Sequence, residues 1–496
     1  MKRLNYETLK QQNHQGYLLQ NAPERILQFG EGNFLRGFVD YFFDIANETC
    51  GFNGKIVLVQ PIAQGLADFV NEQDGLYTLY LRGAENGKKI NEKRIVSAVS
   101  RCINPYAEYA DFLACAKNPD LRYIVSNTTE AGITFDDACK FDDAPATSFP
   151  AKLTRFLYER YLHFGAQHGK GFVVLSCELI DNNGQELKKC VEQYIRLWNL
   201  PEAFAQWVKD ENLFCSTLVD RIVTGYPRGE AEALNEANGY EDKLLDTAEN
   251  FGLWVIEGPD WLRDELPFAK TNLPILVVED HTPYKKRKVR ILNGAHTSMV
   301  PAAYLCGENI VRDCMYDATI SGFMEKTIYD EIIPTLTLPQ EELLAFAGAV
   351  KDRFCNPFID HALLSITLNS TAKWKARVLP SVKGYLKKTG TLPACLTFSF
   401  AAYLSLYRNG TLCDGKLICH RGAEEYVLQD DAAALAFFDA HRGADAQTLA
   451  HDALTDTQMW GEDLSALPGF EAAVVSALHS IENNGMKAAM QAVVAG

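Results

Sequence analysis

Residues 25–37 read Arg-Ile-Leu-Gln-Phe-Gly-Glu-Gly-Asn-Phe-Leu-Arg-Gly, and this stretch decides the fold of the N-terminal part of the chain. The apolar run 25–30 is typical of a buried strand, and residues 38–45 follow a helical period. A strand, a glycine turn and a helix in succession are the context of a dinucleotide-binding loop. Gly30 would allow the tight turn, and Gly32 would let backbone N–H groups approach a pyrophosphate. Leu35 replaces the usual third glycine, so an ordinary strand-to-helix turn stays open as an alternative.

Further strands and helices alternate along the first 280 residues. Apolar runs at 55–61, 123–128, 171–177, 215–223, 253–257 and 274–279 are typical of strands, and 111–116, 151–164 and 191–198 are typical of helices. This alternation predicts an α/β domain with a mostly parallel sheet. Tyr77–Arg82 and Ile90–Arg101 are interpreted as antiparallel strands inserted in that sheet.

The character of the sequence changes near residue 282. Strand-like runs mostly disappear, and helical periodicity dominates, for example at 341–353, 360–368, 396–408, 430–441 and 470–481. We therefore predict two domains: a Rossmann-type α/β domain over residues 1–282 and an all-α domain over residues 283–496. We expect the second domain to carry the substrate and catalytic groups.

Composition limits the classes of protein to which the chain can belong. Its 496 residues carry a net charge of −16, which argues against a nucleic-acid surface and fits a soluble protein acting on a small molecule. No apolar run approaches the roughly 20 residues of a membrane span, and the start lacks the apolar centre of a signal peptide. The 13 cysteines are dispersed without zinc-site spacing, so we expect reduced thiols, no metal and a cytoplasmic location.

Polar residues follow two of the predicted strands at the end where an open α/β sheet binds its ligands. Residues 127–130, Asn127, Thr128, Thr129 and Glu130, follow one strand and are candidate cofactor contacts, although loop capping explains them equally well. Gln60 ends the second strand, where an acid that holds the adenosine ribose is expected. From these residues alone the choice between NAD and NADP stays open.

The second site candidate is Lys-Val-Arg-Ile-Leu-Asn-Gly-Ala-His, residues 288–296. On an α-helix, Asn293 lies about 140° and His296 about 80° around the axis from Lys288, so the three share one side. Such a set could reduce a carbonyl without a metal: the lysine exchanges a proton with the substrate oxygen, the amide donates to the developing alkoxide, and the imidazole orients them. A solvated basic helix start is the alternative.

Taken together, these motifs resemble the polyol-specific long-chain dehydrogenases, the mannitol dehydrogenase family, over nearly the whole chain. The family's Lys-x4-Asn-x2-His signature falls on Lys288, Asn293 and His296, and its Gly-x-Gly-x-Phe-x-Arg loop begins at Gly30 and ends at Arg36. The resemblance implies a metal-free oxidoreductase with NAD as cofactor. It also implies a loop that binds NAD through Phe29, Gly30, Gly32, Asn33, Phe34 and Arg36.

Within the family, the stretches 127–133, 177–184, 292–299 and 353–361 are similar to those of reductases acting on keto-uronates. This similarity implies reversible, NADH-linked reduction of tagaturonate to altronate in hexuronate breakdown. A substrate carboxylate needs a cation, and Lys373 and Arg377 are the candidates. Mannitol-type members carry an oxyanion asparagine where this chain has Leu179, so Asn182 is the candidate replacement.

Two other kinds of function stay open. One is a sister enzyme, either a fructuronate reductase or a mannitol-type polyol dehydrogenase. The other is a nucleotide-binding sensor without turnover, which would have no need of the proton donor Lys288.

Overall fold

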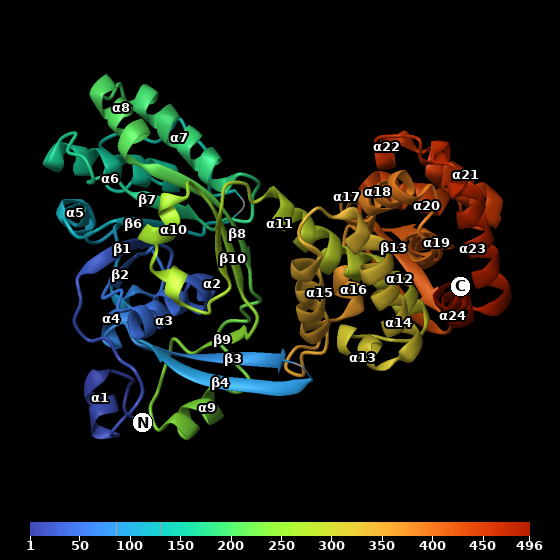
Figure 1. Ribbon diagram of the computed structural model, residues 1–496, viewed down its shortest axis with the longest axis horizontal. Helices are drawn as coiled ribbons and strands as arrows, with labels where there is room; N and C mark the ends of the chain where they lie inside the picture. The colour runs from blue at the N-terminus through green and yellow to red at the C-terminus, as the bar shows by residue number, and fades with distance from the viewer. Residues whose placement is uncertain (86, 130) are drawn as a thin grey trace. The chain divides into compact units, whose positions relative to one another are not determined.

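The computed structural model describes residues 1–85, 87–129 and 131–496. These divide into two compact units, which are described separately: Met1–Arg82 with Ile90–His281, and Gly83–Lys89 with Thr282–Gly496. The short segments 83–85 and 87–89 group with the second unit, and no sequence pattern indicated this. Figure 1 labels the helices and strands of both units.

An eight-stranded sheet forms the centre of the first unit. Its order is β11-β10-β8-β7-β6-β1-β2-β5, and the strands from β5 to β8 run parallel. β10 pairs antiparallel with β8 and parallel with β11. The strands are β1 (Glu24–Phe29), β2 (Lys55–Val59), β5 (Val99–Ile103), β6 (Tyr123–Ser126), β7 (Val173–Ser176), β8 (Leu213–Asp220), β10 (Leu253–Glu257) and β11 (Ile275–Val278). The predicted α/β fold is therefore confirmed, and the strand order reverses between β1 and β6.

Apolar side chains cover both faces of this sheet. Ile26 faces the core that includes Phe42 on α3, whereas Leu27 faces the core that includes Phe156 on α6. This two-sided burial explains why β1 is a continuous apolar run. The helices of the unit are α1 (Tyr6–Gln11), α2 (Asn33–Leu35), α3 (Tyr41–Cys50), α4 (Ala67–Glu72), α5 (Tyr109–Ala114), α6 (Phe149–Phe164), α7 (Asn183–Leu197), α8 (Glu202–Glu211), α9 (Ala231–Asn238) and α10 (Trp261–Glu265).

Local sequence sets both ends of α6. The Ser148 hydroxyl accepts a hydrogen bond from the Ala151 N–H at 3.3 Å, and Pro150 occupies the first turn, where its missing N–H costs nothing. Gly165 then ends the helix at φ +66°, a conformation that favours glycine. The first turn of α6 lies at the carboxyl end of β1, where the Phe149 ring packs against Phe29 with 4.9 Å between the ring centroids.

The predicted antiparallel insertion is wrong in part. The strand expected over 90–101 is divided into β4 (Lys88–Val96) and β5, because the Asp44 carboxylate accepts the N–H and the hydroxyl of Ser97 and interrupts the ladder. β5 joins the main sheet in parallel with β2. β4 lies beside β3 (Tyr77–Glu85) in a separate sheet of order β4-β3-β9, in which β9 (Asp246–Glu249) runs parallel to β3.

The second unit is mostly helical, as predicted, but the expectation that it is all-α is wrong. β12 (Thr411–Cys413), β13 (Lys416–Arg421) and β14 (Glu424–Leu428) form an antiparallel sheet. Asp414 and Gly415 connect β12 to β13 with φ of +49° and +73°, which is the geometry of a two-residue type I′ hairpin. The Asp-Gly pair is thus the sequence signal that was overlooked.

Among the helices of the second unit, the apolar helix α19 is buried along most of its length. The helices of this unit are α11 (Thr282–Arg287), α12 (Gly294–Leu305), α13 (Val311–Tyr316), α14 (Ala318–Lys326), α15 (Gln340–Phe354), α16 (Leu363–Ile366), α17 (Ser370–Arg377), α18 (Leu379–Thr389), α19 (Ala394–Tyr407), α20 (Ala432–Ala440), α21 (Ala446–Thr455), α22 (Thr457–Trp460), α23 (Phe470–Asn484) and α24 (Met486–Ala495). Two stretches are π-helical, η4 (Lys288–Asn293) and η5 (Thr327–Ile332).

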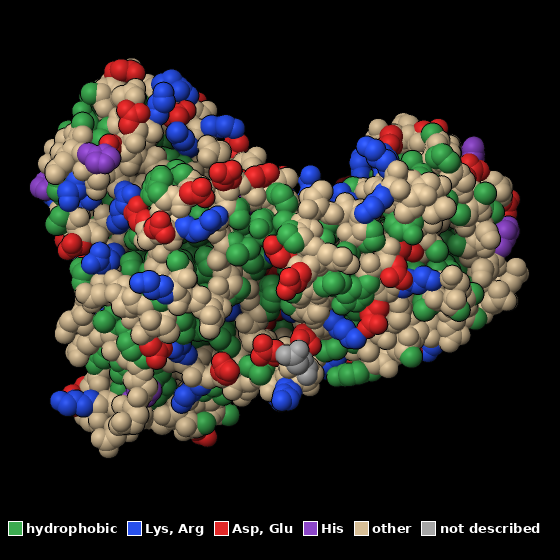
Figure 2. Space-filling model, viewed as in Figure 1, with side chains coloured by type: hydrophobic (Ala, Val, Ile, Leu, Met, Phe, Trp, Pro, Cys, Tyr) green, Lys and Arg blue, Asp and Glu red, His purple; other side chains and the backbone are tan. Residues whose placement is uncertain are grey.

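All 13 cysteines, each within the described ranges, are free thiols. Among residues 1–85, 87–129 and 131–496, no helix is both long and apolar enough to span a bilayer. On the face drawn in Figure 2, acidic and basic side chains are interspersed, and the described residues on that face show no continuous basic patch.

Candidate active site

The glycine loop after β1 adopts the backbone geometry that its sequence indicates. Gly30 has φ +118°, a backbone conformation that residues other than glycine rarely adopt. Its N–H donates to the Val59 carbonyl at 3.0 Å. A Cβ built on Gly32 would meet no atom within 4 Å. The loop is therefore sharply turned at Gly30 and open at Gly32, as a close approach by a ligand requires.

A pocket of about 620 Å³ opens at the carboxyl ends of β1, β2 and β6, where the strand order reverses. In open α/β sheets this is the place at which ligands bind. Five of the predicted cofactor residues line the pocket: Phe29, Gly30, Asn127, Thr128 and Thr129. Glu130 lies outside the described residues. Sequence reasoning overlooked the wall of the pocket formed by Pro61, Ile62, Thr147, Ser148, Phe149 and Lys152.

Four other predicted cofactor residues, Gly32, Asn33, Phe34 and Arg36, are not part of this lining. The Phe34 ring stacks on Phe38 at 5.2 Å between centroids. Arg36 is 2% exposed, and its guanidinium donates to the Glu31 carbonyl at 3.1 Å and to Asn33 Oδ1 at 2.6 Å. The chain is π-helical over Arg36–Asp40, and the guanidinium points into the unit. There its hydrogen bonds to Glu31 and Asn33 stabilise the glycine loop.

Two buried carboxyls lie close to the same arginine. Burial raises the pKa of Asp40 to about 8 and that of Asp246 to about 7, although the positive charge of Arg36 opposes both shifts. Asp40 Oδ2 lies 3.5 Å from the Tyr77 hydroxyl. One guanidinium cannot neutralise two desolvated carboxylates, so this cluster becomes less favourable as pH rises.

Gln60, which stands where a ribose-binding acid was expected, is buried and faces inward. Its amide nitrogen donates to the carbonyls of Ile62 at 2.8 Å and Ala63 at 3.1 Å, and its oxygen accepts the Ala67 N–H. The side chain therefore shapes the loop that follows β2.

Glu178, which follows β7, is a buried polar residue that sequence reasoning overlooked. Its Oε1 accepts the N–H of Thr128 at 3.1 Å, and burial raises the pKa of this carboxyl. Beside it, Leu179 is 66% exposed. Asn182 is also exposed at the start of α7, and its side chain makes no capping bond there. The side-chain amide of Asn182 is thus accessible to a ligand.

In the second unit, the signature Lys288-x4-Asn293 coincides with the π-helical stretch η4. The angles expected for an α-helix therefore do not hold between these two residues. Because a π-turn joins residues i and i+5, Asn293 lies closer to the side of Lys288 than α-helical geometry predicts. His296 follows on α12, one turn further along.

The His296 imidazole is enclosed by rings and surrounded by positive charge. It stacks on Phe354, and its plane is nearly perpendicular to that of His361, with 5.5 Å between the two ring centroids. Burial lowers the pKa of His296 well below its usual range, and the charges of His361, Arg353, Arg377 and Lys373 lower it further. Its Nε2 is buried and has no hydrogen-bond partner among the described residues. The imidazole is therefore neutral and has one ring nitrogen uncommitted.

The two predicted carboxylate-binding residues lie on α17. The Lys373 ammonium donates to the Ile366 carbonyl at 2.9 Å, and burial and the nearby Arg377 lower its pKa. Burial also lowers the pKa of Arg377. Each depressed pKa marks a cation that would gain from an anionic partner.

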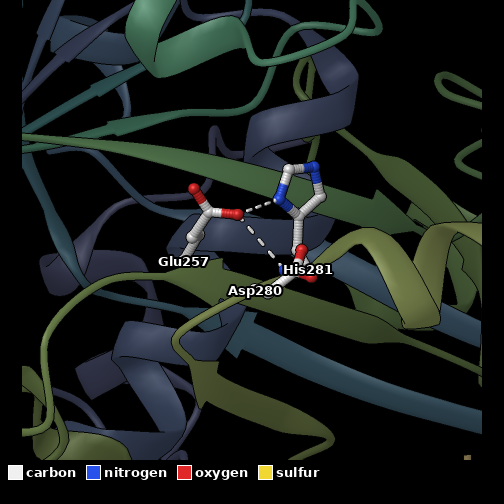
Figure 3. A group of neighbouring side chains, drawn as sticks. All are labelled: Glu257, Asp280 and His281. Atoms are coloured by element: carbon white, nitrogen blue, oxygen red, sulfur yellow. Dashed lines mark hydrogen bonds and ion pairs between the residues drawn. The ribbon is translucent and has the colours of Figure 1, made fainter.

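One group of side chains in the first unit has the composition of a metal site (Figure 3). Potential ligand atoms of Glu257, Asp280 and His281 all lie within 4.8 Å of one another. His281 Nδ1 is already 2.5 Å from Glu257 Oε2, and the His281 N–H is 3.2 Å from the same oxygen. The hydrogen bonds between Glu257 and His281 explain why these side chains lie close together without a metal. They join the end of β10 to the segment that precedes Thr282.

Comparison with solved structures shows the same fold in two sugar-alcohol dehydrogenases. D-Sorbitol dehydrogenase in substrate-free form is 21% identical, with a TM-score of 0.81 over 98% of this chain and 100% of that chain. Pseudomonas fluorescens mannitol 2-dehydrogenase, in a ternary complex with NAD and D-mannitol, is 21% identical, with a TM-score of 0.67 over 99% of each chain.

Relatives of known name are much more similar in sequence. Altronate oxidoreductase of Cronobacter sakazakii is 50% identical over 475 residues, which are 94% of this chain and 96% of that protein. Altronate oxidoreductase of Escherichia coli strain K12 is 48% identical over 476 residues, which are 95% and 96% of the two chains. Residues 24–270 match the mannitol dehydrogenase Rossmann domain, and residues 280–482 match the mannitol dehydrogenase C-terminal domain. The chain therefore belongs to the mannitol dehydrogenase family.

Proposed function

We propose that this protein reduces D-tagaturonate to D-altronate with NADH, reversibly and without a metal. The observation that carries the proposal is the 48–50% identity, over 94–95% of the chain, to proteins named altronate oxidoreductase. The cations Lys373 and Arg377 near His296 support a substrate that carries a carboxylate.

The pocket at the ends of β1, β2 and β6 suits the proposed cofactor. Its glycine at φ +118° and the open space at Gly32 leave room for a pyrophosphate against backbone N–H groups. Residues 61–66 after β2 include no lysine or arginine to receive a 2′-phosphate, which favours NADH over NADPH. Bound NADH supplies the hydride that converts the ketone carbon to the alcohol.

The groups of the second unit handle the proton and the charge. Lys288 donates a proton to the substrate oxygen during reduction and takes it back during oxidation. Asn293 donates a hydrogen bond to the same oxygen as negative charge develops there. His296, neutral and held by Phe354, uses its free ring nitrogen to orient the lysine or a substrate hydroxyl.

Two features distinguish this proposal from mannitol-type chemistry. Leu179 cannot donate the hydrogen bond of the family's oxyanion asparagine, and we assign that role to Asn293. The exposed amide of Asn182 stays a predicted substrate contact. The carboxylate of the uronate forms charge-assisted hydrogen bonds with Lys373 and Arg377.

An assay panel tests the function directly. Oxidation of NADH and of NADPH is followed at fixed enzyme concentration with tagaturonate, fructuronate and fructose. We expect the largest kcat/KM with tagaturonate and NADH. A preference for fructuronate or for neutral fructose would replace the proposal by a sister activity, and NADH binding without oxidation of any substrate would indicate a sensor.

A further inference from the structure

Lys152, on the first turn of α6, has an ammonium group buried in the wall of the cofactor pocket. The residue is 3% exposed and lines the pocket together with Gly30 and Pro61. Its Nζ donates to the Pro61 carbonyl at 3.0 Å, to the Thr147 carbonyl at 3.0 Å and to the Tyr106 hydroxyl at 3.1 Å. All three donors of the ammonium are thereby used.

The three acceptors are neutral, and no carboxylate among the described residues pairs with Lys152. A buried charge without an opposite charge is costly, and burial accordingly lowers the pKa of Lys152 to about 8. The Tyr106 ring, whose centroid lies 5.2 Å from Nζ, offsets part of this cost through a cation–π interaction, which is weaker than an ion pair. The described residues thus leave this cation short of negative charge.

The ligand that we propose for the pocket supplies that charge. NADH carries two negative charges on its pyrophosphate, and the protein's net charge of −16 otherwise repels it. We propose that Lys152 is a cofactor-binding residue, whose buried ammonium attracts the phosphates of the dinucleotide while it fixes the loop after β2 to the start of α6. Because its hydrogen bonds are committed, the charge acts through space, where a low dielectric strengthens it. This inference rests on the proposed use of NADH.

Lys55 provides a matched control within the same unit. It is also 3% exposed, and its Nζ donates to the carbonyls of Ser97 and Val99 and to the Tyr6 hydroxyl, at 2.8, 3.0 and 3.2 Å. Burial lowers its pKa to about 8 as well. Lys55 begins β2, however, whereas the pocket lies at the carboxyl end of that strand. Loss of Lys55 should cost stability and leave cofactor affinity unchanged.

The pH dependence separates a charge effect from a purely structural one. A lysine whose pKa is lowered is neutral above that pKa, so NADH affinity should be constant below pH 7 and should fall as pH rises through about 8. The other titratable groups that face this corner are Tyr106 on the loop after β5 and Asp136 and Cys139 on the segment before α6. A neutral lysine keeps two of its three hydrogen bonds, so a structural role alone would change affinity much less over this range.

The experiment is a fluorescence titration of the full-length protein with NADH between pH 6.5 and 9.5, with Tm measured in parallel. We expect Lys152→Met to raise Kd about tenfold at pH 7 and to abolish its rise above pH 8. Lys55→Met should lower Tm and leave Kd within twofold. Lys152→Arg, charged throughout the range, should bind NADH at pH 9 as well as at pH 7.

Two results would overturn the inference: equal NADH affinity of Lys152→Met and Lys55→Met, or the same pH profile in the wild type and Lys152→Arg. If Lys152→Met does not fold, the wild-type and Lys152→Arg profiles still decide. Failure of the wild type to bind NADH saturably would instead reject the proposed function, so the two failures are distinguishable.

Discussion

The imidazole of His296 stacks on the phenyl ring of Phe354, with 4.0 Å between the ring centroids and 12° between the ring planes. Phe354 ends α15, whereas His296 lies on α12, so two helices distant in sequence fix this imidazole. A flat contact of this kind restricts rotation of the ring and leaves its nitrogens at the edge free for polar partners.

Phe354→Leu should therefore lower kcat about tenfold while NADH affinity stays the same, because the imidazole loses its flat support and its fixed orientation. Single-turnover kinetics measure the reaction rate, a fluorescence titration measures NADH affinity, and Tm measures stability. Val350→Ala, a buried change on the same helix, is the control for stability alone. If the two variants lose activity in proportion to Tm, the stack serves the fold and not the reaction.

Lys288→Ala should lower turnover by about two to four orders of magnitude, the usual contribution of a positioned acid/base. NADH binding should be unchanged, because the cofactor pocket is lined by first-unit residues. Lys286→Ala, an exposed lysine two residues earlier, should retain activity within a few-fold. Turnover that survives in Lys288→Ala would mean that another group transfers the proton.

Selectivity for a carboxylate-bearing substrate should depend on α17. Lys373→Met or Arg377→Met should reduce the ratio of kcat/KM for tagaturonate to that for fructose roughly ten- to a hundred-fold, since a charge-assisted hydrogen bond contributes about 1.5–3 kcal/mol. Lys375, on the same helix, donates to the Met459 carbonyl, and Lys375→Met is the control. A ratio unchanged in both test variants would show that other residues bind the carboxylate.

Stability should respond to pH through the buried acids next to Arg36. The pKa of Asp40 is raised to about 8 in the folded protein, above its unfolded value near 4, so ionisation favours the unfolded state increasingly between these two values. Asp40→Asn should thus gain stability relative to the wild type as pH rises from 5 to 8.5, as urea unfolding can measure.

The matched variant for this test is Asp44→Asn. Burial raises the pKa of Asp44 as well, but its carboxylate pairs with Arg94 at 2.6 Å and accepts the Ser97 N–H, so the loss of these contacts in Asp44→Asn should destabilise the protein throughout the range. The opposite trend in Asp40→Asn, a loss of stability relative to the wild type as pH rises, would show that its carboxylate is stabilising when charged.

Exhaustive treatment with a chelator should leave kcat/KM for tagaturonate unchanged. In the group drawn in Figure 3, His281 Nδ1 and Glu257 Oε2 are already hydrogen-bonded to each other. In the proposed reaction the proton comes from Lys288, so no metal is needed. A different result would place a required metal at that group: the chelator abolishes the activity of the wild type, a divalent cation restores it, and the activity of His281→Ala responds to neither.

The sequence by itself determined that the first unit is α/β and that the second is mostly helical, because both features rest on local patterns. The apolar run of β1, the turn at Gly30 and the helical period that follows specify a strand, a glycine turn and a helix without reference to the rest of the chain. The helical periodicity of the second unit is likewise a local pattern, which can be recognised one helix at a time. The Asp414-Gly415 hairpin is also a local signal, and it was outweighed by the helical pattern around it.

Only the tertiary structure decided which side chains face the pocket and what surrounds the candidate catalytic groups. Arg36 and Gln60 occupy motif positions, yet π-helical geometry and side-chain hydrogen bonds turn both into the unit. Lys152 follows Thr128 by 24 residues and has no motif, and its place in the wall results from the packing of α6 on the sheet. Burial, the depressed pKa of His296 and its contact with Phe354 depend on residues brought together by folding. Periodicity describes one element at a time, whereas desolvation and through-space charge depend on all the elements that pack around a group.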